Sequence, residues 1–475
     1  PDGTNPSSLR TGWLARDHGD RAFLDADGCM HSARPRAVLS GVHSLRRSGV
    51  SQRTSGSRTT GSRTSGSRTS GSRTSGSRTS SRTRSGASSG RKLRAVEVEV
   101  VQVGPKPEHL LLGATGLLCL LGIVMVYSAS SVASVQKDNP NWSTGVRQLV
   151  WMVLGLALGV VASRIPLTFW RDRIAPVMIL VALGLQAILA LDIALGAVGG
   201  PHLPFALTKN GATRWLGTEA FQVQPSDFAK LALILWLARL LDKRSREIGS
   251  RELLHPIFAV TGALALMVLL GDDLGTTLLL GVIVIVMLFL AGAPLRQVGG
   301  IAAAAASAAA LVILVFGGFR VQRIAAYFNP SGHETTGGYQ LLQSQIGFAS
   351  GGLFGSGPGN SRAKWGYLPE ADTDFILAII GEELGLLGSL LVLGAFVVFM
   401  FAGIRIALRS RSQFGRLVAI GITTWIGVQA MINIMVTVGA LPTKGITLPF
   451  VSYGGSSLMM CMLSVGVMVS VARDS

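Results

Sequence analysis

The sequence has few charged residues and few cysteines for its length. Only 14% of its 475 residues are charged, whereas 48% are hydrophobic. This balance excludes a string of ordinary soluble domains and is typical of a membrane protein. The three cysteines, Cys29, Cys119 and Cys461, lack the spacing of a zinc site or a disulfide framework.

Acidic residues are scarcer than basic ones, 25 against 43, so the formal net charge is +18. Most arginines lie in the first hundred residues or in short loops between apolar runs, which is the distribution of a membrane protein rather than a nucleic-acid-binding protein. We expect no nucleic acid partner. The N-terminus also lacks a basic stretch followed by an apolar run and a cleavage site, so we expect no cleaved signal peptide.

Residues 1–105 are polar, and from Arg53 to Arg78 they repeat Arg-Thr-Ser-Gly-Ser every five residues. Such a segment cannot bury enough apolar surface to offset its ordering entropy. We predict a disordered basic cytoplasmic tail, followed by a polytopic transmembrane domain over 106–475. The tail is either simply solvated or held to anionic lipids by its basic residues.

Ten apolar runs in the rest of the sequence are candidates for membrane-spanning helices. They cover 109–130, 148–163, 174–194, 224–241, 255–271, 274–292, 298–317, 373–402, 415–437 and 449–471. We predict an all-α integral membrane protein with about ten transmembrane helices. A basic loop follows every even-numbered helix, and basic loops stay in the cytoplasm. Both termini are therefore expected there, with a long extracytoplasmic loop over about 318–372 between helices 7 and 8.

This long loop carries charged residues, and their presence on the translocated side of a membrane calls for a structural or functional explanation. They are Arg320, Arg323, Arg362 and Lys364, together with Glu334, Glu370, Asp372 and Asp374 where the loop returns to the membrane. The loop is either solvated with internal ion pairs, or a site where cations bind an anionic ligand beside a carboxylate. Its Gly-rich stretch over 350–360 lacks the ending and context of a P-loop, so we expect a tight loop with short amphipathic helices near 341–348.

Asp374 stands at the entrance of an apolar run. Partial desolvation would raise its basicity and suit it to general-base catalysis, although a nearby arginine would lower its pKa. Its alternative role is that of a helix N-cap. Glu382 and Glu383 come two turns deeper, where an unpaired carboxylate is costly, so each should pair with a cation or face a polar cavity. Their role could be structural or functional.

Several motifs together resemble the SEDS (shape, elongation, division and sporulation) family, also known as the FtsW/RodA family. The matches are residues 367–375, 379–385 and 448–457, with shorter ones at 214–215, 224–226, 273–276 and 359–361 before Lys364. Residues 441–445 and 125–131 resemble the division branch more than the elongation branch. Asp227, Asp272 and Asp372 depart from the family's usual Glu, Pro and His. Ser452, in the last long match, has no His and Asp partners placed to activate it, so close helix packing explains that run better.

The resemblance implies a peptidoglycan glycosyltransferase that polymerises lipid II, a disaccharide-pentapeptide on a polyprenyl diphosphate, during cell division. Inverting transfer from a diphosphate donor needs one base and cations for the leaving group, without a second carboxylate. We expect Asp374 to be this base. The expected substrate-binding residues are Arg323, Lys364, Glu370, Arg214 and Lys444.

The resemblance further implies a class B penicillin-binding protein, a single-span transpeptidase, as a partner, with other division proteins and membrane lipids. The expected location is the cytoplasmic (inner) membrane at the division septum. A divalent cation such as Mg²⁺ or Mn²⁺ could share the leaving-group role, although no ligand cluster demands one. The alternatives are a lipid II flippase, an elongation-type polymerase or a scaffold. A flippase needs access to both leaflets, whereas this chain concentrates its unusual charge on one side.

Overall fold

The computed structural model describes residues 105–474 except 137, 139, 210, 219–220, 316, 330–331 and 333–336. These residues belong to one compact unit, Glu97–Ser475. Residues 1–104 of the predicted N-terminal tail lie outside the described residues.

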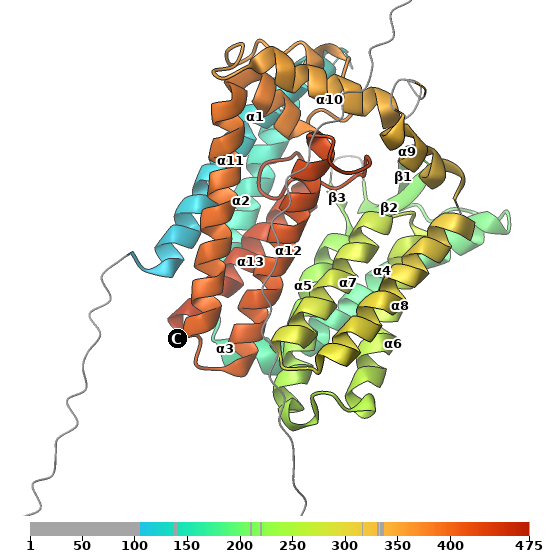
Figure 1. The fold of residues 1–475 in the computed structure, drawn as a ribbon, viewed down its shortest axis with the longest axis vertical. Helices are drawn as coiled ribbons and strands as arrows, with labels where there is room; N and C mark the ends of the chain where they lie inside the picture. Colours follow the sequence, from blue (N-terminus) through green and yellow to red (C-terminus); the bar gives the residue numbers. More distant parts are fainter. Residues whose placement is uncertain are drawn as a thin grey trace, which may run out of the picture. The chain divides into compact units, whose positions relative to one another are not determined.

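In the described part of the chain, ten long helices pack in two groups (Figure 1). The first group consists of α1 (Pro107–Gln136), α2 (Ser143–Arg164), α11 (Ile376–Arg409), α12 (Gln413–Thr437) and α13 (Gly455–Arg473). The second consists of α4 (Ala175–Ala197), α5 (Pro225–Lys243), α6 (Arg251–Leu270), α7 (Leu274–Leu290) and α8 (Leu295–Val315). Helix α12 joins the groups, because it packs against α5 and α7 as well as α11.

Each expected span coincides with one of these helices. Among the described residues, eight helical segments are long and apolar enough to cross a membrane. They are α1, α2, α6, α8, α11, α12, α13 and the segment Leu167–Ala197, in which α3 (Leu167–Phe169) and the π-helix η1 (Trp170–Ile174) lead into α4. Helix α7 is shorter, and α5 carries several charged side chains. The chain is a multi-pass membrane protein, and the number of ten spans stays a prediction.

One end of the bundle carries the elements that were expected to form a long loop, together with a small sheet (Figure 1). The helices there are α9 (Gly318–Phe328), α10 (Gly337–Gly351) and the 3₁₀ turn η4 (Ala363–Trp365). Helix α10 contains the expected amphipathic segment. The antiparallel sheet has the order β1 (Ala206–Lys209), β2 (Ala212–Gly217), β3 (Gln222–Val223). The prediction of an all-α chain did not include this sheet, because strands this short leave no readable alternation.

The opposite end of the bundle is basic. Helices α2, α5, α11 and α13 each end in a cationic residue, Arg164, Lys243, Arg409 and Arg473 respectively, and the 3₁₀ turn η2 (Ser245–Glu247) follows α5. Arg473 donates to the carbonyl oxygen of Ser163 (3.1 Å), and a guanidinium nitrogen of Arg171 lies 3.6 Å from Asp242 Oδ2. These contacts hold the cationic helix ends together on one side.

Helix α11 is broken at Gly385, whose φ of +69° is not helical. The Gly-rich stretch after α10 fills the break: the amides of Ser356 and Gly357 donate to the carbonyls of Glu382 and Glu383 at 2.9 and 3.1 Å. A Cβ on Gly385 would lie 2.4 Å from a backbone nitrogen of this stretch, so the close approach requires glycine. The broken helix thereby has its polar backbone groups satisfied by protein.

Two expected spans begin later than predicted. Helix α11 begins at Ile376 instead of 373, because the amides of Asp374 and Phe375 bond to the carbonyl of Glu370 in a turn. Helix α13 begins at Gly455 instead of 449, because the preceding residues form a turn in which Phe450 has a φ of +66°. Both turns lie at the end of the bundle that carries the sheet.

Candidate active site

Asp374 lies two residues before α11 and is partly buried. The loop between α12 and α13 passes beside it, because a Cβ placed on Gly445 would lie 3.4 Å from Asp374 Oδ2. Arg323 of α9 and Arg214 of β2 are close enough to stabilise its charged form. Four segments that are distant in sequence therefore meet at this carboxylate.

Burial raises the pKa of Asp374 from 3.8 to about 7. The negative charge of Glu370 acts in the same direction, and that of Asp372 adds to it, whereas Arg323 and Arg214 lower the pKa. Desolvation is the largest of these effects and disfavours the carboxylate form. The result is a base that titrates near neutral pH, which is the property that general-base catalysis requires.

Arg214 is fixed by the turn between α6 and α7. Its Nε donates to the carbonyl of Gly271 and a terminal guanidinium nitrogen donates to that of Asp272, both at 2.8 Å. Asp272 has a φ of +63°, which proline cannot adopt. The aspartate at this position, where the resembled family usually has proline, is compatible with the turn that presents both carbonyls to Arg214.

Arg323 is half-buried on α9. Burial lowers the pKa of Arg323, as does the neighbouring charge of Arg214, whereas Asp272 and Asp374 raise it. The structure therefore brings together three of the residues expected in the site: one carboxylate and two arginines. Two guanidinium groups beside a base are suited to bind a diphosphate through charge-assisted hydrogen bonds.

Lys444, another expected cation, lies in the loop between α12 and α13 and directly precedes Gly445, which borders Asp374 Oδ2. Like Lys364, it is absent from the charges that shift the pKa of Asp374. Burial lowers the pKa of Lys444. Within the described part of the chain, its ammonium group has neither a hydrogen bond nor an ion pair. This cation is accordingly available to an anionic ligand.

Glu370 shapes the loop before Asp374. It has a φ of +58°, its carbonyl accepts from the amide of Asp374 (3.1 Å), and its Oε2 accepts from Thr373 Oγ1 (2.9 Å). The side chain is exposed, and its charge acts on Asp374. The structure thus places Glu370 beside the expected base.

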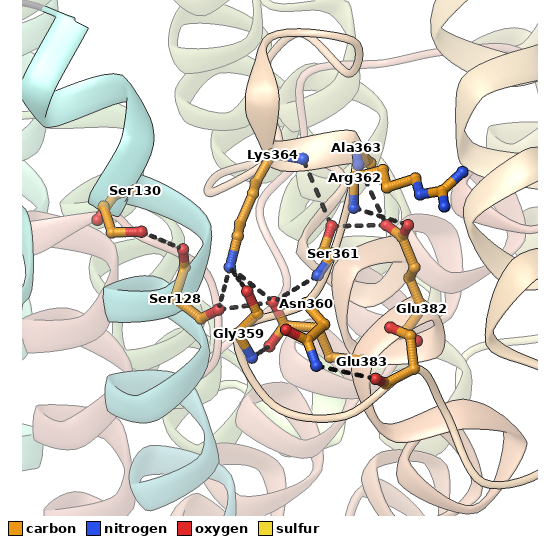
Figure 2. Close-up of polar contacts among 12 residues, drawn as sticks. Ser128, Ser130, Gly359, Asn360, Ser361, Arg362, Ala363, Lys364, Glu382 and Glu383 are labelled. Atoms are coloured by element: carbon orange, nitrogen blue, oxygen red, sulfur yellow. Dashed lines mark hydrogen bonds and ion pairs between the residues drawn. The ribbon is translucent and has the colours of Figure 1, made fainter.

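Lys364 is engaged in a buried polar cluster (Figure 2). Its Nζ lies 3.2 Å from Glu383 Oε1 and 3.3 Å from Ser128 Oγ of α1, and it also donates to the carbonyl of Gly359. It is absent from the charges that shift the pKa of Asp374. This geometry favours a structural role over the contact with a diphosphate that the resemblance implied.

The carboxylates of Glu382 and Glu383 hold the loop over 359–364 against α11 (Figure 2). Glu382 accepts from the amide of Arg362 (2.8 Å) and from Ser361 Oγ (2.5 Å). Glu383 accepts from the amide of Gly359 (2.9 Å). Of the two roles that the sequence left open, these contacts support the structural one.

Ser452 braces the loop that carries Asp374. Its Oγ donates to the carbonyl of Thr373 and accepts from the amide of Leu448 (2.8 Å), while the amide of Tyr453 donates to the carbonyl of Asp372 (2.9 Å). The hydroxyl group is therefore used in backbone contacts, as expected for a packing role rather than a nucleophile.

A buried ion pair in α5 was not recognised in the sequence. Asp227 Oδ1 lies 2.8 Å from Lys230 Nζ, and Lys230 also donates to Gln429 Oε1 (3.0 Å) on α12. Its ammonium group lies 5.0 Å from the ring centroid of Trp425. The three-residue spacing of opposite charges on a helix was the available signal.

Comparisons with known proteins agree with the motifs. The family model described as "Cell cycle protein" (FTSW_RODA_SPOVE) matches residues 108–475. The probable peptidoglycan glycosyltransferase FtsW of Geobacter metallireducens is 38% identical over 364 residues, which cover 76% of this chain and 93% of that protein. Stage V sporulation protein E of Bacillus subtilis is 38% identical over 371 residues, covering 78% and 98%.

Two solved structures share the fold. A chain of a peptidoglycan synthase complex, described as coordinating polymerization and crosslinking, has a TM-score of 0.61 and 25% identity, and the match covers 77% of this chain and 97% of that one. The rod shape determining protein RodA of Thermus thermophilus has a TM-score of 0.51 and 27% identity, with 77% and 96% covered. The chain therefore belongs to the FtsW/RodA/SpoVE family of cell cycle proteins and is most similar to FtsW.

Proposed function

We propose that this chain is a peptidoglycan glycosyltransferase that polymerises lipid II during cell division. Relatives at 38–39% identity are described as probable peptidoglycan glycosyltransferases. The observation that carries the proposal is the environment of Asp374, a partly desolvated carboxylate whose pKa of about 7 is set by burial, beside Arg214 and Arg323. A base and two cations are the groups that transfer from a diphosphate donor requires.

The chemistry follows from these groups. Asp374 accepts the proton of the acceptor sugar's 4-hydroxyl while that oxygen bonds to the anomeric carbon of the donor. The bond from this carbon to the diphosphate breaks, and the configuration inverts. Arg214, Arg323 and Lys444 stabilise the negative charge of the departing diphosphate, so no second carboxylate is needed to protonate it.

The site belongs on the outer face of the cytoplasmic membrane, with both termini in the cytoplasm. The cationic helix ends lie opposite the end of the bundle that carries α9, α10 and the sheet, and cationic ends are retained inside. Because the charged site is at one end only, the geometry favours an enzyme over a flippase, which needs access from both sides. Similarity to FtsW points to the division septum.

A class B penicillin-binding protein, a single-span transpeptidase, is the partner that we propose. A match to a chain of a synthase complex supports it, since that complex couples polymerization to crosslinking. Other division proteins and membrane lipids complete the set of proposed partners.

A divalent cation, if the reaction uses one, would be held mainly by the substrate's own phosphates. Among the described residues, no three or more His, Cys, Asp or Glu side chains are grouped to hold a metal ion. The carboxylate of Asp374 already faces two arginines, which would repel a metal ion. We therefore assign the protein's contribution to stabilising the departing diphosphate to its own cationic side chains.

The test uses the chain purified with its presumed transpeptidase partner and labelled lipid II in detergent. Asp374→Asn removes the base, and Asp138→Asn is the matched control, an exposed carboxylate in the loop between α1 and α2. We expect glycan polymer from the wild type and from Asp138→Asn, and none from an intact complex of Asp374→Asn. Translocation of lipid II in vesicles without polymer would establish the flippase instead, and neither activity from an intact complex would favour a scaffold.

A further inference from the structure

A buried polar stripe runs along α12 toward the site. Gln429, Asn433 and Thr437 are spaced one helical turn apart and are each at most 2% exposed. Polar side chains on one face of a membrane helix bond across to neighbouring segments, because lipid offers them no partner. In this stripe, Asn433 is the residue that reaches the loop of Asp374.

The amide of Asn433 joins two segments of the site. Its Nδ2 donates to the carbonyl of Asp374 at 2.8 Å and to the carbonyl of Ile446 at 2.7 Å. A primary amide nitrogen carries two donor hydrogens, so both are used. Asp374 is thereby anchored to a residue 59 positions away in the chain.

This double contact fixes how the catalytic carboxylate lies against the loop between α12 and α13. Ile446 directly follows Gly445, whose backbone borders Asp374 Oδ2, and Lys444 precedes it. Movement of either carbonyl would change the position of the base relative to this cation. It would also open the packed side of the carboxylate to water.

We propose that Asn433 is a positioning residue for the transfer reaction: its amide holds Asp374 and the segment over 444–446 in their catalytic arrangement. This inference rests on the proposed function, since it assigns a role within that active site. Asn433 itself contacts no reacting atom. It acts through the backbone of the residue that takes the proton.

The chemical requirement is specific to an amide. Two buried carbonyl oxygens converge on one side chain, and both need a donor. Leucine has the same branched heavy-atom shape as asparagine, with a larger volume and no donor, and serine has one O–H. Asn433→Leu therefore removes both contacts without adding a charge, and Asn433→Ser retains a single donor.

Gln429 provides a matched control one turn earlier on the same helix. Its Nε2 donates to the carbonyl of Thr447 (3.0 Å), so it holds the same loop as Asn433 without contacting the loop of Asp374. Gln429→Met removes this contact with little change in volume. It also removes the Oε1 acceptor of Lys230 Nζ and Trp425 Nε1, neither of which touches the loop of Asp374. A general loosening of the loop would affect both variants, whereas loss of the anchor on Asp374 is confined to Asn433→Leu.

The experiment measures polymerisation of labelled lipid II by the complex with the transpeptidase, against lipid II concentration and between about pH 5 and pH 9. In folded, partner-bound Asn433→Leu we expect kcat to fall roughly 10- to 100-fold with little change in KM. We also expect the acidic limb of the pH profile to move to lower pH, because water reaching Asp374 lessens its desolvation. Gln429→Met should keep the wild-type limb.

The charged groups that face Asp374 do not change in either variant, so they cannot shift the limb by themselves. They are Glu370 and Asp372 on its own loop, Arg323 on α9 and Arg214 on β2. Lys444, on the loop after α12, directly precedes Gly445, which borders the carboxylate. A displaced limb consequently reports a change in the position or hydration of the base.

Two results would overturn the inference. One is a wild-type rate and limb in Asn433→Leu. The other is a lower rate with an unmoved limb, which means that the residue supports only the fold. If Asn433→Leu does not fold, Asn433→Ser takes its place. We then expect an intermediate rate and an acidic limb that moves to lower pH, and an unmoved acidic limb in Asn433→Ser also refutes the role. Failure of the proposed function is distinguishable, because the wild type itself would then make no polymer.

Discussion

Replacing Asp374 by asparagine should stabilise the protein above neutral pH while abolishing its activity. The folded state raises the pKa of Asp374 from 3.8 to about 7, mainly by burial. Below about pH 4 the carboxyl group is protonated in both the folded and unfolded states, so it contributes nothing to pH dependence. As the pH rises from about 4 to 7 the unfolded state loses this proton first, and stability falls. Above pH 7 the folded state carries the full free-energy cost of holding Asp374 as a desolvated carboxylate.

The magnitude follows from the shift. Roughly three pK units correspond to about 4 kcal/mol as an upper limit, at 1.36 kcal/mol per unit. Asp374 is partly exposed, and solvent screening reduces this value, so we expect about 1–2 kcal/mol of stabilisation in Asp374→Asn. For a chain of this size that is a rise of a few degrees in Tm.

Thermal unfolding followed by tryptophan fluorescence at a fixed scan rate would measure the effect, since the chain has eight tryptophans. The gain in Tm should be largest at pH 8, roughly two-fifths as large at pH 5 and nearly absent at pH 4, and Asp138→Asn should show none of it. A variant that is no more stable than the wild type at pH 8 would refute the reasoning. It would mean that Arg214 and Arg323 fully compensate the desolvation of the carboxylate.

Three further predictions concern the surroundings of the site. Glu370→Gln removes a charge that raises the pKa of Asp374, so the acidic limb of the polymerisation profile should move to lower pH; a limb at higher pH would contradict this. Glu383→Gln leaves a buried lysine without its carboxylate and should lower stability by about 3–5 kcal/mol in thermal unfolding, with the acidic limb unmoved. Gly385→Ala should destabilise by at least about 1–3 kcal/mol, because its φ is +69° and its Cβ would clash with the backbone of Gly355, whereas Gly394→Ala, in open space on the same helix, should be neutral or slightly stabilising; equal effects of the two would refute the argument.

The helices were predictable because a lipid environment leaves the backbone few choices. Each polar backbone group in a bilayer must bond within the chain, so long apolar runs become helices. All ten expected runs coincide with helices, and Asp374 could be singled out because a carboxylate at the start of such a run is unusual. The motifs near the C-terminus of the chain identified its family in the same local way.

The contacts around Asp374 were not predictable in this manner. Lys364 was expected at the diphosphate, but tertiary packing places its ammonium against Glu383, 19 residues away, and Ser128, 236 residues away. The role of Asn433 depends on two carbonyls that meet only when α12 packs beside the start of α11. No local pattern encodes such pairings, because they arise from the packing of helices that are distant in sequence.

The sequence by itself determined that the chain crosses a membrane, that its long apolar runs are helical, and which carboxylate is the candidate base. Hydropathy and charge act over a few residues and can be read directly. The tertiary structure decided which cations reach Asp374, that its pKa is about 7, and which amide anchors it. Desolvation and hydrogen-bond geometry depend on every segment that packs around a group, and those segments meet only in the folded protein.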